Sequence, residues 1–234
     1  MDLLFDSMQS AFLLLISLDA ELLEIVGVSL KVSFGATIIA SIVGIPTGFI
    51  IAYSVFPGKR FLLTCLNTLL ALPTVVIGLF VYSFISRRGI LGSLDLLYTQ
   101  KAIVIGQVIL IIPVITTLTI AAVSRIDARY RMTALTLGAN RYQMAAVILK
   151  EARYGIFAAV IAAYGRVIAE VGISMMLGGN AKGFTRTMTT AMALEYDKGE
   201  FVLAVALGIS LMAFAFGINM LFHFFQGRMK NDVV

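Results

Sequence analysis

Two charged side chains interrupt an otherwise apolar stretch of this chain. Arg166 and Glu170 lie four residues apart within residues 155–177. Side chains at this spacing meet on one face of a helix, so the two charges can neutralise each other. If the stretch crosses a membrane, a lone central Arg costs about 2.5–3.5 kcal/mol on insertion scales. The spacing therefore predicts a structural ion pair, and the alternative is that Arg166 binds an anion.

A second polar segment, residues 180–190, is rich in hydroxyl groups. Hydroxyls and amides can donate hydrogen bonds to an oxyanion without retaining it by strong charge. The alternative is a capped helix that only contacts another protein, and the residues leave both interpretations open. The candidates for an anion pathway are Asn180, Thr185, Arg186, Thr187 and Thr189.

Other reactive residue types predict no catalytic or metal chemistry. Cys65 is the only cysteine and lies in an apolar run, which favours packing. His223 is the only histidine and has no partners that could complete a metal site. The chain also lacks a Gly-x-x-x-x-Gly-Lys-Ser/Thr phosphate-binding loop. We therefore expect no cofactor in this chain, and any ATP with its Mg²⁺ has to be bound by a partner.

Long uncharged runs dominate the sequence. A membrane helix needs about 20 apolar residues to cross a hydrocarbon core of roughly 30 Å. Together with 60% hydrophobic and 13% charged residues, these runs predict an all-α polytopic membrane protein with five spans. The fifth span is the stretch that holds Arg166 and Glu170, and the four uncharged runs are residues 32–58, 61–86, 102–124 and 201–227.

The basic residues predict the orientation. Ten Lys and Arg flank the spans on the side of residues 57–60, 124–154 and the tail, against six on the other side. The positive-inside rule then places loop 124–154 and the C-terminus in the cytoplasm and the acidic N-terminus outside. The net charge of +5 is thus explained by orientation, and we expect no nucleic-acid binding.

Three regions follow from this reading. Residues 1–21 have no basic region or cleavage site typical of a signal peptide, so they predict an interfacial helix on the outer surface. Asp19 is expected to cap the next helix. Residues 22–227 form the membrane domain in contact with lipid, and residues 228–234 form a cytoplasmic tail.

The polar loop 124–154 is the predicted docking surface for a soluble partner. Residues 133–140 can form a short helix with a small-residue face, followed by an amphipathic segment over residues 141–153. The alternative is a connection that touches only lipid headgroups. In this interpretation the small side chain of Gly138 allows a close approach.

The spacing of Ala134, Gly138 and Ile148 resembles the cytoplasmic coupling loop of permease subunits of type I ABC importers. That pattern reads Glu-Ala-Ala, three residues, Gly, nine residues, Ile-x-Leu-Pro. Here Met132 and Thr133 replace Glu-Ala, and Lys150 and Glu151 replace Leu-Pro. A Pro would break the helix after Ile148, whereas Glu151 does not.

Further segments resemble the sulfate, molybdate and tungstate group of these permeases. They are Arg166-x-x-x-Glu170, the loop over residues 178–190, residues 71–78 and Arg88-Gly89-Ile90-Leu91-Gly92. The likeness extends from about residue 22 to 225 and is closest to the tungstate importer permeases. It implies a homodimeric pore in a prokaryotic cell membrane, two cytoplasmic ATPase subunits and an extracytoplasmic oxyanion-binding protein. Ala134, Gly138, Ile148 and Glu151 would then couple the pore to the ATPase.

Several alternatives remain open from the sequence. Molybdate or sulfate could replace tungstate as the substrate. A stand-alone channel or secondary transporter would need no ATPase, but it would lead us to expect inverted repeats, which the sequence does not show. A membrane scaffold without a transported substrate is a third class.

Overall fold

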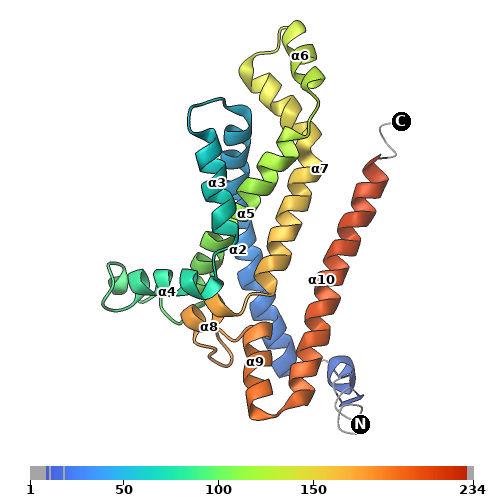
Figure 1. The fold of residues 1–234 in the computed structure, drawn as a ribbon. Coiled ribbons are helices and arrows are strands. Elements are labelled where there is room, and N and C mark those ends of the chain that lie inside the picture. The colour runs from blue at the N-terminus through green and yellow to red at the C-terminus, as the bar shows by residue number, and fades with distance from the viewer. Residues whose placement is uncertain (1–8, 11, 18, 231–234) are drawn as a thin grey trace.

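The computed structural model describes residues 9–10, 12–17 and 19–230, and within these ranges the regular elements are all helical. Four long helices run along the molecule: α2 (Ala20–Tyr53), α5 (Gln100–Ser124), α7 (Arg141–Ile168) and α10 (Phe201–Lys230) (Figure 1). Short α6 (Ala128–Thr136) lies at one end, and α9 (Met188–Lys198) lies at the other. Between them lie α3 (Lys59–Leu70), α4 (Thr74–Ile85), the 3₁₀ turn η1 (Gly92–Leu94) and α8 (Gly172–Gly178).

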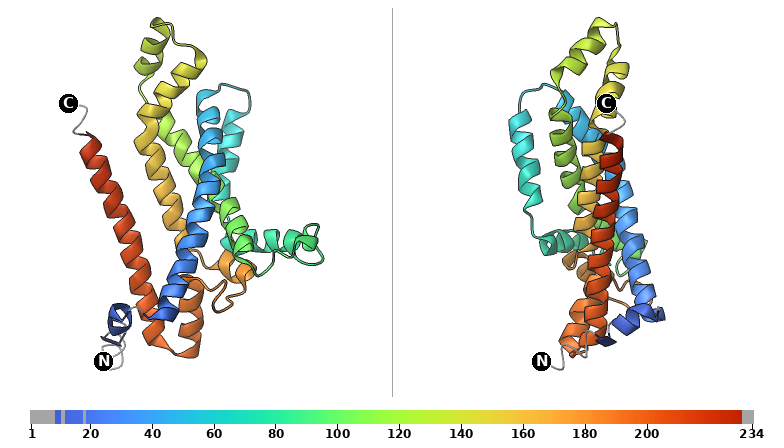
Figure 2. Two further views of the ribbon diagram at one scale, coloured as in Figure 1. Left: turned by 180° about the vertical axis from the view of Figure 1, so that it is seen from behind. Right: turned by 90° about the vertical axis from the view of Figure 1, so that its right-hand side faces the viewer.

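The all-α membrane fold is confirmed, with its spans built differently from the expectation. Three helices are each long and apolar enough to cross a membrane, namely α2, α5 and α10. The pairs α3 with α4 and α7 with α8 are bent by 97° and 59°, and counting each pair as one span gives five. Figure 2 shows α4 lying across the direction of the long helices.

The predicted span over residues 61–86 is therefore wrong as a continuous helix. Helix α3 ends at Leu70, and Pro73 precedes the first residue of α4 with φ −61°. Proline lacks an N–H and disfavours helical geometry in the residue before it, so Leu72 and Pro73 separate the two helices. By contrast, Pro46 and Pro113 lie inside α2 and α5.

Of the predicted outer N-terminal segment 1–21, residues 1–8, 11 and 18 lie outside the described residues, and its interfacial placement stays a prediction. Residues 12–16 are helical. The expected cap is confirmed, because the Asp19 carboxylate accepts hydrogen bonds from the backbone N–H groups of Glu21 and Leu22 at 2.9 and 3.1 Å. The first long helix thus begins at Ala20, twelve residues before the predicted run.

Helices α2 and α5 form the centre of the bundle through small residues. A side chain at Gly48 would place its Cβ 2.7 Å from the Thr116 carbonyl oxygen, and one at Gly44 would meet Ile115 at 3.0 Å. The hydroxyls of Thr47 and Thr116 lie 3.3 Å apart between these contacts. Close backbone approach through small residues is typical of helix packing in membranes.

Gly48→Ala is expected to destabilise the protein by about 1–3 kcal/mol, because the added methyl group overlaps the backbone of α5. The matched control is Gly27→Ala on the same helix, where the added Cβ has no neighbour within 4 Å. Thermal unfolding in detergent measures both. Equal melting temperatures for the two variants would show that this packing is not needed.

Candidate functional site

The two breaks in the membrane helices lie against each other. A Cβ at Gly172, the first residue of α8, would lie 2.9 Å from the hydroxyl of Thr74, the first residue of α4. One turn further along α4, Gly78 leaves room for the sulfur of Met176. Glycines at these two positions therefore let the beginnings of α4 and α8 pack together inside the bundle.

The predicted ion pair between Arg166 and Glu170 is not formed. Both residues lie in the described part of the chain, and no salt bridge joins them there. Helix α7 ends at Ile168, so Glu170 is no longer on the helical face that carries Arg166. The four-residue spacing predicted a contact only for an unbroken helix.

Each of the two charges instead contacts a helix end at a break. The exposed Arg166 guanidinium donates a hydrogen bond of 3.3 Å to the carbonyl of Leu70, the last residue of α3. The buried Glu170 carboxylate accepts one of 3.1 Å from the N–H of Ile173 in the first turn of α8. Backbone groups freed inside a membrane have to find such partners. The two charged residues therefore stabilise the two breaks separately, Arg166 at the end of α3 and Glu170 at the start of α8.

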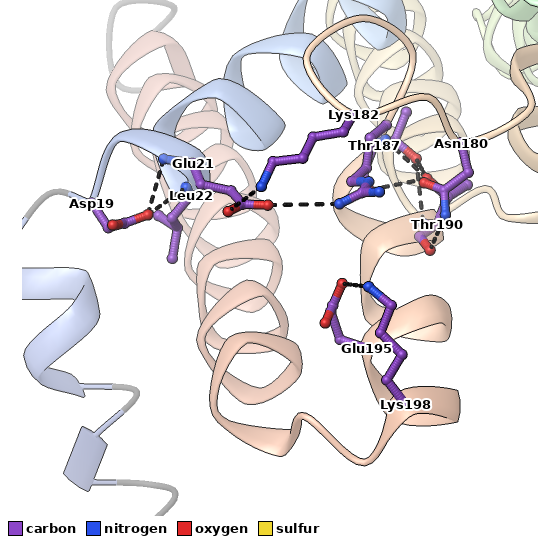
Figure 3. Close-up of polar contacts among 10 residues, drawn as sticks. Asp19, Glu21, Leu22, Asn180, Lys182, Thr187, Thr190, Glu195 and Lys198 are labelled. Atoms are coloured by element: carbon purple, nitrogen blue, oxygen red, sulfur yellow. Dashed lines mark hydrogen bonds and ion pairs between the residues drawn. The ribbon is translucent and has the colours of Figure 1, made fainter.

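The hydroxyl-rich segment is a folded loop between α8 and α9 (Figure 3). Buried Thr185 donates 2.6 Å to the carbonyl of Gly178 and accepts from the N–H of Ala181. Thr187 and Thr190 form a reciprocal capping box at the start of α9. Thr189 donates 2.7 Å to the carbonyl of Glu170, which fixes α9 to the α7–α8 break. These hydroxyls therefore form hydrogen bonds within the chain, and Thr189 also lines an open pocket of about 520 Å³.

Arg186 and Asn180 belong to the same loop. The Arg186 guanidinium lies 3.6 Å from one carboxylate oxygen of Glu21, and Lys182 lies 2.7 Å from the other. The Asn180 amide donates to the carbonyl of Thr190. The loop is thus fastened to the start of α2.

The predicted docking segment folds as two helices joined by a tight turn. The short helix covers residues 128–136, so the predicted range 133–140 was wrong at both ends. Gly138 adopts φ +77° and lets the N–H of Ala139 bond the Ala134 carbonyl, which ends α6. Asn140 and Gln143 then form a capping box that starts α7. Helix α7 continues through Lys150 and Glu151, as expected without a proline there.

The four predicted coupling residues occupy different environments. Ala134 and Ile148 are buried in a cluster with Val123, Met144 and Ala152, which holds α6 on α7. Gly138 has open space around its would-be Cβ, so its role here is the left-handed turn and not a close approach within the chain. Glu151 is exposed on α7.

Sequence reasoning missed the outward-facing apolar residues of this segment. Large apolar side chains on a polar loop outside the membrane mark a contact surface for another protein. The sequence carried a signal for them, because large apolar residues stand among the six Lys and Arg of residues 124–154. They are Met132, Leu135, Leu137 and Tyr142, and we call them the coupling face.

A groove of about 890 Å³ at the end of α4 was also not predicted from the sequence. Gly89 and Gly92 have no room for a Cβ, which lets the chain fold back beneath Arg87 and Arg88. The groove is open to the surface and lined by both polar and apolar side chains. In the described part of the chain, no cluster of three or more His, Cys, Asp or Glu side chains could hold a metal ion.

Because Arg166 and Glu170 stabilise different helix ends, we expect the stability effects of Arg166→Gln and Glu170→Gln to add. Residues that share no contact usually show couplings below about 0.5 kcal/mol. Thermal unfolding of both single variants and the double variant in detergent gives the coupling. If the double variant is clearly more stable than the less stable of the two single variants, the result would support a direct ion pair between Arg166 and Glu170.

Comparison with known proteins agrees with this architecture. Residues 44–231 match the family model described as binding-protein-dependent transport system inner membrane component. A tungstate uptake system permease of Peptoclostridium acidaminophilum is 36% identical, covering 97% of this chain and 99% of the relative. The corresponding Campylobacter jejuni permease is 35% identical over 95% and 93%.

Among solved structures, a bacterial alginate ABC transporter in complex with an alginate-bound periplasmic protein superposes with a TM-score of 0.75. It covers 93% of this chain and 82% of its own, at 17% identity, and therefore shows a shared fold. The chain thus belongs to the family of binding-protein-dependent transport system inner membrane components and is a multi-pass permease subunit of an ABC transporter.

Proposed function

We propose that this chain is the membrane subunit of an ATP-driven importer whose substrate is tungstate. The observation that carries the proposal is the 35–36% identity to two tungstate uptake permeases over almost the entire chain. The molybdenum permease of Escherichia coli is 28% identical over 70% of the chain. Molybdate is accordingly the second candidate, and sulfate is the third.

Two copies of the chain form the pathway, with an ATPase subunit on each and an oxyanion-binding protein outside. ATP and Mg²⁺ are held by the ATPase subunits. Support for an ATPase contact comes from the coupling face, which exposes apolar side chains beside Arg129 and Arg141. Support for an external binding protein comes from the family to which the chain belongs.

Helix α7 is suited to transmit motion from the ATPase to the membrane. It has 28 residues and runs unbroken for about 42 Å at 1.5 Å per residue. One end packs on α6 through Ala134 and Ile148, and the other end carries Arg166 and leads into α8. A displacement of α6 on ATPase closure would therefore move the helix breaks as one rigid body.

The orientation belongs to the same proposal. The end of the molecule with α6 lies in the cytoplasm, and the end with α9 and the N-terminal part of α2 lies outside (Figure 1). Lys59 and Arg60 at the turn between α2 and α3 support this assignment, because basic residues are enriched on the cytoplasmic side of membrane spans.

Uptake into proteoliposomes tests the function. With the ATPase, the binding protein and ATP present, we expect tungstate to accumulate, molybdate to compete less well and sulfate to compete hardly at all, because the chain is more similar to the tungstate permeases than to the molybdenum permease. Sulfate competing as well as tungstate would overturn the substrate assignment. Uptake without ATPase would favour a channel or secondary transporter, and no uptake despite ATPase binding would favour a scaffold.

The coupling face provides a second test. Leu137 is 82% exposed on it, and Leu137→Asp is expected to reduce ATPase co-purification at least tenfold by placing a charge in an apolar contact. The control Ile90→Asp changes a residue that is 84% exposed in the loop after α4. If both variants retain the ATPase equally, the coupling face is not the docking surface. Gly138 is less informative, because any bulky residue there strains the turn.

A further inference from the structure

Helix α3 has a polar side that the fold does not use. Arg60, Thr64, Asn67 and Thr68 recur at helical spacing and are all exposed. The hydroxyls of Thr64 and Thr68 bond carbonyls of their own helix, and the Asn67 amide has no partner within the described chain. An amphipathic helix inside a membrane protein places its polar side toward protein or water, because lipid cannot satisfy it.

Arg166 contacts the end of α3 that is farther from Lys59. Its hydrogen bond to the Leu70 carbonyl places the guanidinium at the last residue of α3, eleven residues from Lys59. At 1.5 Å per residue this is a depth of about 16 Å, close to half of a hydrocarbon core of roughly 30 Å. The arginine is therefore near the middle of the membrane.

Arg166 also keeps most of its donors free. A guanidinium has five N–H donors, and in this structure one hydrogen bond, to Leu70, is recorded for Arg166. The side chain is exposed, and Glu170 does not neutralise it. Charged residues at this depth face a water-filled cavity or a protein interior, and here the interior of the described chain does not cover it.

The surrounding surface of α7 is unlike one that faces lipid. Exposed Ala162 and Ala169 and half-buried Ala158 and Gly165 flank Arg166, and all four are small. At comparable positions α10 exposes Met212, Phe216 and Met220, which are large and apolar. The small side chains leave the guanidinium accessible.

From these observations we propose that Arg166 and the polar side of α3 form an intramembrane passage site for the oxyanion. This rests on the proposed function, because the occupant is the transported anion. Asn67, Thr64 and Thr68 line the approach, and Arg166 supplies the positive charge at its deepest point. One hydrogen-bonded cation with neutral polar neighbours attracts a dianion without enclosing it, which favours release.

Thiol labelling tests the site independently of transport. In a Cys65→Ala background of the full complex in proteoliposomes, Asn67→Cys should react with a water-soluble anionic thiosulfonate at least tenfold faster than Met212→Cys. Met212 is a matched control, because it is 74% exposed in the middle of α10. Equal rates at the two positions would show that α3 does not face water and would overturn the proposal.

The charge of Arg166 gives the second readout. Arg166→Gln should lower the preference of Asn67→Cys for the anionic over a cationic thiosulfonate at least threefold, whereas Arg166→Lys should keep it. A purely structural arginine predicts no change in this preference, and that result would contradict the proposal.

Uptake separates this inference from the proposed function. If the unmodified complex accumulates tungstate, Arg166→Gln and Asn67→Leu should each reduce the rate at least tenfold while ATPase co-purification is retained. Normal uptake by both variants would overturn the passage site and leave the importer intact. Failure of the unmodified complex to accumulate any oxyanion would instead overturn the proposed function, whatever the labelling shows.

Discussion

The structure depends on the need to satisfy backbone groups where two membrane helices break. Pro73 and the turn after Ile168 free carbonyl and N–H groups at a depth where lipid offers no hydrogen bonds. Arg166 donates a hydrogen bond to the carbonyl of the last residue of α3, and the Glu170 carboxylate accepts one from an N–H in the first turn of α8. Gly78 and Gly172 then let α4 and α8 pack together, so the two broken spans form one unit.

This unit links the two ends of the molecule. Thr189 joins the start of α9 to the carbonyl of Glu170, and Ser29 of α2 accepts from the N–H of Met188. At the opposite end, α6 is held on α7 by buried Ala134 and Ile148. A rigid α7 between these two contacts is a physical basis for coupling events at α6 to the helix breaks. The outer threonines hold the loop between α8 and α9.

Much of the fold was predictable because membrane spans depend on long uncharged runs, as residues 102–124 and helix α5 illustrate. The helix breaks were harder to predict. Residues 61–86 carry no charge and read as one helix, although Pro73 was a visible signal. Arg166 and Glu170 have pairing spacing, and only the end of α7 at Ile168 separates them. The threonines over residues 185–190 were chosen by type, whereas the buried hydrogen bond of Thr189 to the carbonyl of Glu170 joins residues that are distant in sequence.

Anomalous diffraction at the tungsten absorption edge tests the central claim most directly. Crystals of the complete transporter, trapped with tungstate after release from its binding protein, would locate the heavy atom without assumptions about the protein. We expect a peak between the Arg166 guanidinium and the polar side of α3. A peak beside Thr185 and Thr187, or tungsten confined to the binding protein in every trapped state, would contradict it.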